Sequence, residues 1–160
     1  MPAASLYEVI LAVHIMAVVV AFGVTFAYPI MFAVAARADP RSLPVMHRVE
    51  YTIERFLINP GLLVVLAAGI YLASEGHHWS EFFVQWGLGA VVAIGAAVGA
   101  IMIPTAKRAE TLAARAVAAQ GDGPFETGPE YQALARRLST VGALLSVLVL
   151  VTILFMVVKP

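Results

Sequence analysis

One histidine lies inside a long apolar run near the start of the chain. In residues 11–32, LAVHIMAVVVAFGVTFAYPIMF, His14 stands near one end and the pair Tyr28-Pro29 near the other. An ionisable group in such a run is a functional-site candidate by default. A neutral imidazole can bind haem iron or another metal, or it can relay a proton. Alternatively, His14 hydrogen-bonds to a neighbouring helix and packs there, or it reaches a nearby membrane surface.

The other side chains that could bind a metal are few. His77 and His78 are adjacent in a short polar segment, and Met156 lies near the end of the chain. These residues could join His14 as ligands of haem or copper, because both accept imidazole and thioether ligands. No regular spacing links them, and a histidine pair in a polar loop is commonly solvated. The absence of cysteine excludes disulfides, thiolate metal sites and a cysteine nucleophile.

A second candidate site lies where a charged segment meets an apolar one. Glu50 and Glu54 precede the segment Asn59-Pro60-Gly61. Proline lacks a backbone donor and leaves a carbonyl one turn earlier without its bond, so a helix can kink there. A broken membrane helix can build a substrate site, although capping and interfacial ion pairs are the alternatives. Arg136 and Arg137 could pair with these glutamates or with anionic lipid.

The composition places these residues in a membrane protein. The 160-residue chain is 61% hydrophobic and 12% charged, which is far more apolar than a soluble domain. Ten Lys and Arg balance ten Asp and Glu, so no net charge points to a nucleic-acid partner. The motifs of nucleophile elbows, phosphate-binding loops, dinucleotide folds and metalloproteases are absent from the sequence. The first apolar run is too long for a signal peptide and is interpreted as a retained span.

Four segments contain no Asp, Glu, Lys or Arg. They are residues 9–36, 56–74, 82–106 and 138–158. A helix needs about 20 apolar residues to cross a hydrocarbon core about 30 Å thick, and each segment comes close to that length or exceeds it. The sequence therefore predicts one all-α domain, residues 1–160, folded as a four-helix membrane bundle. The first span is long enough to tilt, to protrude or to bend at Pro29.

The positions of the basic residues predict the orientation. Lys and Arg are concentrated between spans one and two and between spans three and four, whereas the segment SEGHHWSE between spans two and three has none. Short cytoplasmic loops carry the excess of Lys and Arg, so both termini are expected outside the cytoplasm. We expect a multi-pass protein of the bacterial cytoplasmic (inner) membrane. Its expected partners are the lipid bilayer and either further copies of the chain or a larger membrane complex.

The two basic segments have helical patterns of their own. Four apolar residues at helical spacing predict an amphipathic helix running into span two; they are Val45, Val49, Ile53 and Phe56. The Ala-rich segment after span three predicts that this helix continues until GDGP, residues 121–124. A new helix is expected to start at Pro129 after Thr127 or Gly128. Residues 107–137 are thus expected to form a cytoplasmic helical hairpin.

The polar residues of span one share one face. At 100° per residue, a narrow arc holds His14, Ala21, Thr25, Tyr28 and Phe32. Polar groups in a membrane turn away from lipid. We therefore expect Thr25 and Tyr28 to line the interior together with His14.

Span three carries small residues at a spacing that favours helix contacts. Gly95 and Gly99 in GAAVG would let neighbouring backbones approach closely. The motif predicts that span three is the crowded central helix. Homodimerisation through the same motif is the alternative.

Several segments together resemble a known family. LAVHIMAVVVAFGVTFAYPIMF, HRVEYTIERFLINPGLLVVLAAGIYL, a Trp-bearing loop and LFMVVKP resemble bacterial four-span proteins described as predicted integral membrane proteins of unknown function. More distantly, the sequence resembles the HemJ-type protoporphyrinogen oxidases, which also begin with a histidine on span one and close with Lys-Pro. That resemblance implies a haem-associated bundle, with haem b as cofactor and His14 as iron ligand. The chain has no histidine in span three, and it has RRLSTVG where those oxidases carry Asn-Glu-X-Pro.

Three functions follow as hypotheses. The first is a haem- or porphyrin-associated redox protein with His14 as axial ligand, and it is the leading one. The second is a transporter or channel element that works as an oligomer, with the break at Asn59-Pro60 and the polar face of span one lining the path. The third is a non-catalytic accessory subunit of a larger membrane complex.

Overall fold

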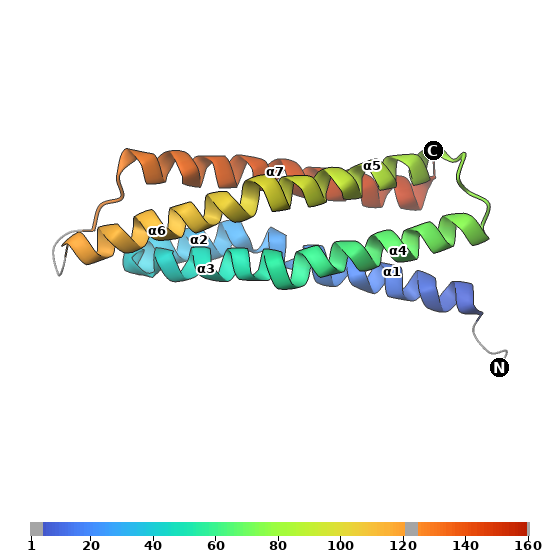
Figure 1. Cartoon of the computed structure of the whole chain (residues 1–160), viewed down its shortest axis with the longest axis horizontal. Helices are drawn as coiled ribbons and strands as arrows, with labels where there is room; N and C mark the ends of the chain where they lie inside the picture. The colour runs from blue at the N-terminus through green and yellow to red at the C-terminus, as the bar shows by residue number, and fades with distance from the viewer. Residues whose placement is uncertain (1–4, 121–124, 160) are drawn as a thin grey trace.

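Four long helical rods run side by side in alternating directions in the computed structural model (Figure 1). The structure describes residues 5–120 and 125–159, and within them it contains helices and no strands. The rods are Leu6–Ala38, Pro40–Glu75, Phe82–Gln120 and Pro129–Val158, and each is long and apolar enough to cross a membrane. This confirms the predicted four-helix bundle.

The bundle has two chemically different ends. The start of α1 (Leu6–Gly23), the end of α7 (Pro129–Val158) and the loop between α4 (Asn59–Glu75) and α5 (Phe82–Ala97) lie at one end, which we call the termini end (Figure 1). The opposite end holds the turn at residues 39–42 and the connection from the third rod to the fourth. We call it the basic end, because every Lys and Arg except Lys159 lies toward it.

Three of the four rods change helical form along their length. The first consists of α1 (Leu6–Gly23), the 3₁₀ turn η1 (Val24–Phe26) and α2 (Tyr28–Ala38). The second consists of η2 (Pro40–Ser42), α3 (Leu43–Ile53), the π-helical η3 (Glu54–Ile58) and α4. The third consists of α5, the π-helical η4 (Val98–Met102) and α6 (Ile103–Gln120). The fourth rod is the single helix α7 (Pro129–Val158).

The irregular segments η1, η3 and η4 each end two or three residues before a proline. These prolines are Pro29, Pro60 and Pro104. Each removes a backbone donor and crowds the carbonyl one turn earlier, so the helix widens or tightens there instead of staying regular. The breaks at Pro29 and Pro60 agree with the sequence prediction, and the break before Pro104 is an addition to it. We call the region of the three breaks the break level.

The helical extensions at the basic end are as expected. Helix α3 runs into the second span, and α6 continues from the third span to Gln120. Gly128 is the N-cap of α7 and Pro129 is its first residue. The predicted break at residues 121–124 lies outside the described residues. Rods of 30 to 39 residues are about 45–60 Å long, so they exceed a hydrocarbon core of about 30 Å.

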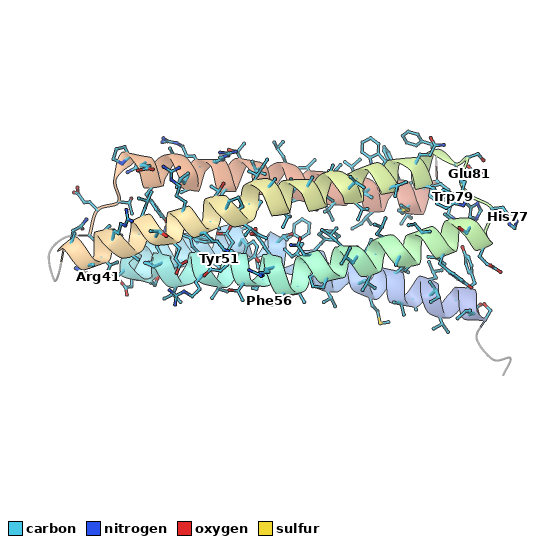
Figure 2. All side chains as sticks on the ribbon, in the orientation of Figure 1. Arg41, Tyr51, Phe56, His77, Trp79 and Glu81 are labelled. Carbon is cyan, nitrogen blue, oxygen red and sulfur yellow. The ribbon has the colours of Figure 1, made fainter. Side chains whose placement is uncertain are left out.

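The amphipathic helix α3 turns its polar side inward. Val45 and Phe56 are 60% and 71% exposed, whereas His47, Glu50 and Glu54 are buried. Figure 2 shows Phe56 on the outer side of its rod. A lipid environment favours this arrangement, because apolar side chains can face hydrocarbon while polar ones find partners inside the bundle. The sequence predicted this helix. The structure adds that its polar side chains lie inside the bundle.

Two apolar clusters hold the rods together. One lies at and beyond the break level toward the termini end, and its buried members are Ala21, Phe22, Ile58, Leu62, Ile94, Val98 and Val149. The other lies toward the basic end, and its buried members are Leu43, Met102, Ala106, Ala109, Ala113, Tyr131 and Leu138. The main pairings are α1 with α4, α3 with α6, and α7 with both α5 and α6.

Close approach between rods occurs at glycines other than those expected. A Cβ atom on Gly61 would lie 2.7 Å from the Cβ atom of Ala21, so α1 and α4 pack through this position. A Cβ atom on Gly99 would meet nothing within 4 Å, and one on Gly95 would lie 3.8 Å from Leu62 Cδ1. Gly95 and Gly99 of GAAVG are therefore not points of close approach between rods.

Candidate functional site

A buried histidine joins the second rod to the fourth. His47 on α3 and Tyr131 on α7 are 2% and 8% exposed. His47 Nδ1 lies 2.9 Å from Glu50 Oε2, and His47 Nε2 lies 3.0 Å from the Tyr131 hydroxyl oxygen. A carboxylate only accepts hydrogen bonds, so Nδ1–H donates to Glu50, while Nε2 shares a hydrogen bond with the Tyr131 hydroxyl. Both nitrogens of the ring are thus partnered.

Aromatic rings enclose His47. The Phe32 ring from α2 lies with its centroid 4.7 Å from that of His47, and the Tyr131 ring meets His47 edge-on at 5.6 Å. The imidazole is therefore held by side chains from α2, α3 and α7. This packing fixes the orientation of the ring and excludes water from it.

Two further polar groups are buried nearby without partners. Glu54 is 2% exposed and lies on η3, and Tyr28 is 9% exposed and lies at the start of α2. Glu54 Oε2 and the Tyr28 hydroxyl have no hydrogen-bond partner among the described residues. Tyr28 lies within electrostatic range of both Glu50 and Glu54. We call Tyr28, His47, Glu50, Glu54 and Tyr131 the buried polar cluster.

The arginines of the basic end lie outside this cluster. Arg48 Nη2 lies 2.6 Å from Glu110 Oε1, and Arg108 pairs with Glu130. These ion pairs connect the second, third and fourth rods at the surface of the bundle. In the part of the chain that the structure describes, neither Arg136 nor Arg137 forms an ion pair with Glu50 or Glu54. The pairing considered for Arg136 and Arg137 is therefore not seen.

His14 lies between α1 and α4 and is half-buried. A Cβ atom on Gly69 would lie 3.3 Å from His14 Cε1, so the ring packs over the backbone of α4. Its Nδ1 atom is buried and has no hydrogen-bond partner among the described residues. Thr25, on the same face, donates its hydroxyl to the Phe22 carbonyl at 2.7 Å, and Tyr28 is buried. His14 and Thr25 are thus partly buried and Tyr28 is buried on this side of span one.

The remaining metal-ligand candidates do not meet His14. His77 and His78 lie in the loop at the termini end, where Figure 2 shows His77 close to Trp79 and Glu81. His77 Nδ1 donates to the Glu75 carbonyl at 3.1 Å, and the His78 ring packs over Gly76. Met156 packs against Gly87, between α7 and α5. Within the described residues, no three His, Asp or Glu side chains are arranged to hold a metal ion.

Asn59 lies on a separate, outward-facing surface. It lines a groove of about 360 Å³ between α4 and α5, together with apolar residues that include Leu62, Val91 and Gly95. The backbone of the second rod is irregular just before Pro60. The Asn59 side chain, in contrast, borders this groove. The polar group that the break places inside is Glu54.

His47 and Tyr131 were not among the residues singled out from the sequence. A signal for His47 was present, because His47, Glu50 and Glu54 recur at intervals of three and four residues and so share one helical face. The apolar stripe on the other face of α3 is the more obvious pattern, and the prediction of an amphipathic helix was based on that stripe. Tyr131 carries no local signal, since its partner is 84 residues away.

Comparisons with known proteins agree with this architecture. No curated protein and no solved structure matches the chain significantly. A family model described as "Predicted integral membrane protein (DUF2269)" matches residues 8–160, which include all four rods. The chain therefore belongs to the DUF2269 family of predicted integral membrane proteins.

Proposed function

We propose that this integral membrane protein is a transport element that binds a proton or a small cation in the buried polar cluster. One observation carries the proposal: Glu54 is 2% exposed, its Oε2 atom lacks a partner, and it lies at the break level. Ionisable residues inside membrane bundles are costly and commonly mark ion pathways or proton relays. A buried carboxyl group with an unused acceptor atom is suited to bind such a species.

The break level supports this role. Transporters commonly build ion sites where membrane helices are interrupted, and π-helical segments are frequent at functional sites. Here η1, η3 and η4 interrupt three rods, and Glu54 is the first residue of η3. A proline cannot bond the carbonyl one turn before it, so Pro29 and Pro60 each remove one regular helical hydrogen bond at the same level.

The bundle is closed on one side of the cluster. The apolar cluster that contains Phe22, Ile58 and Leu62 separates Glu54 from the termini end. Release of a bound species requires side chains to move, because Glu54 is 2% exposed, and passage to the termini end requires the rods to rearrange. We propose that the basic end faces the cytoplasm of a bacterial cell and that the chain works as a homo-oligomer or within a larger membrane complex.

Flux measurements test this function. The purified protein is reconstituted in liposomes with a trapped pH indicator or sodium indicator, and an ion gradient is applied. We expect wild-type protein to dissipate one of the two gradients and Glu54→Gln to abolish this flux. Glu81→Gln, which changes an exposed carboxyl group in the loop at the termini end, is the matched control and should keep wild-type flux. Equal flux in wild-type and Glu54→Gln liposomes would contradict the proposal.

A second candidate function rests on His14. Its Nδ1 atom is buried against α4 without a hydrogen-bond partner among the described residues, so haem b would have to bind at Nε2 or after α1 and α4 move apart. We propose as the alternative that the protein binds haem through His14. Protein purified from haem-replete cells would then show a Soret band that His14→Ala removes. Colourless protein from such cells would count against this function.

A further inference from the structure

We infer that Glu54 holds a proton in the closed bundle, as a neutral carboxylic acid beside the Tyr28 hydroxyl. The inference deepens the proposed transport function, because it names the species that occupies the site. It rests on the space around Glu54, on the charges that face it and on its position in the fold.

There is no room for a larger species at the unpartnered atoms. Glu54 Oε2 and the Tyr28 hydroxyl oxygen each expose less than 1 Å² to a water-sized probe. A buried water needs its own space and several polar partners, and a metal cation needs several oxygen ligands around it. Only a proton can satisfy Glu54 Oε2 without movement of the neighbouring side chains.

The surrounding charges also favour the neutral acid. From α3, Glu54 is faced by Glu50 and His47, and the His47 Nδ1–H group already serves Glu50. From α2 it is faced by Tyr28, which carries no charge. The titratable groups of α1 and α4, the other elements packed on η3, lie toward the termini end; they are Tyr7, Glu8, His14, Tyr71 and Glu75.

The cations around Glu54 are engaged elsewhere. Arg55, the next residue along η3, is exposed and lies over the Phe56 ring, 5.7 Å from its centre, and Arg48 and Arg108 pair with Glu110 and Glu130 at the surface. The Lys107 ammonium lies 5.4 Å from the centre of the Tyr51 ring. An ionised Glu54 would therefore be a buried charge without a counter-charge, next to a second carboxyl group. Burying such a charge costs much free energy, whereas burying the protonated, neutral group costs far less.

The position of Glu54 explains how the proton can be exchanged. Its backbone carbonyl accepts the π-type hydrogen bond from the Asn59 amide, so the residue begins the widened turn before Pro60. A return of this turn to regular helical geometry would rotate the residues of η3 relative to α4. Release of the proton and rearrangement of the break level are thereby linked.

Infrared spectroscopy of the reconstituted protein tests the inference. A protonated carboxyl group has a C=O stretching band that carboxylates lack, and this band shifts in heavy water. We expect wild-type protein to keep one such band at mildly alkaline pH, where exposed carboxyl groups are ionised. Glu54→Gln should lose it, whereas Glu50→Gln and Glu81→Gln should retain it. Absence of the band from wild type, or its persistence in Glu54→Gln, would overturn the inference.

Tyr28→Phe gives a second measurement that does not alter Glu54 itself. Loss of the neighbouring hydroxyl should shift the frequency of the acid band without removing it, and an unchanged frequency would contradict the position of the acid beside Tyr28. The infrared and flux results also separate the two proposals. Flux without an acid band would overturn the protonated Glu54 and leave the transport function standing. An acid band without proton or sodium flux would overturn the transport function and leave the protonated Glu54 standing.

Discussion

The Tyr131 hydroxyl oxygen and His47 Nε2 lie 3.0 Å apart across 84 residues of sequence. This contact joins α3 to α7 in the interior of the bundle, near the basic end. At the surface of the same end, ion pairs link neighbouring rods. The fourth rod is unbroken, so the contact connects the buried polar cluster to the one rod that passes the break level as regular helix. His47 is consequently a fixed point of the cluster, while Glu54 sits on an irregular turn.

Tyr131→Phe is expected to destabilise the bundle. The substitution keeps the ring but leaves His47 Nε2 buried without a partner, which costs about 1–3 kcal/mol. Unfolding in detergent, followed by circular dichroism, should show a lower midpoint for this variant. Tyr71→Phe, on α4 toward the termini end, is the control and should unfold close to wild type. Unchanged stability of Tyr131→Phe would argue that the hydrogen bond contributes little.

Gly61→Ala is expected to disturb the packing of α1 on α4. The added Cβ atom would lie 2.7 Å from Ala21 Cβ, and overpacking of this kind typically costs about 1–3 kcal/mol. Gly99→Ala is the matched control, because its Cβ atom would meet nothing within 4 Å and alanine is the better helix former. Thermal unfolding should therefore separate the two variants. A larger loss for Gly99→Ala would indicate instead that the GAAVG face packs against another copy of the chain.

Pro60→Ala is expected to reduce ion flux without unfolding the protein. An alanine at this position supplies the amide that Pro60 lacks, so it can bond the Phe56 carbonyl and favour a regular helix in place of η3. Glu54 would then leave its present position while the rod itself gains stability. Liposome flux and thermal unfolding measure the two effects separately. Pro44→Ala, in the first turn of α3, is the control, since a proline there forfeits no hydrogen bond.

The sequence was sufficient to predict the four spans and the helical extensions. The uncharged segments indicated the spans, and the pair Gly128-Pro129 indicated where α7 begins. Proline chemistry likewise indicated the breaks at Pro29 and Pro60. These features depend on local properties of the chain, namely hydropathy and backbone donors, so a single sequence contains them.

The buried polar cluster could not be assembled from the same information. Its members come from α2, α3, η3 and α7, and their contacts depend on how the rods rotate about their axes. Along α3 and η3 the usual rule, by which the apolar stripe is buried, was reversed, with Val45 and Phe56 exposed and Glu50 and Glu54 inside. Close approach depended on rotation too, since Gly61 meets Ala21 while Gly99 meets no other rod. Helix rotation in a lipid environment thus decided which candidate residues came together.

Glu54→Gln is expected to flatten the dependence of bundle stability on pH. The wild-type carboxyl group keeps its proton when folded, because ionisation would leave a buried charge beside Glu50. In the unfolded chain the same group ionises at the ordinary pH of an exposed glutamate. Folding therefore favours the protonated form, so the contribution of Glu54 to stability is full in mild acid and declines as the pH rises. An amide cannot ionise and contributes no such decline.

Thermal unfolding in detergent across mildly acidic to alkaline pH measures this difference. The wild-type midpoint should fall toward alkaline pH, whereas the Glu54→Gln midpoint should stay closer to its acidic value. Glu81→Gln should follow the wild-type curve, because the Glu81 side chain is exposed and ionises similarly in both states. Parallel curves for wild type and Glu54→Gln would mean that Glu54 binds its proton no more tightly in the bundle than in water, and the proton would then have to be sought elsewhere in the cluster.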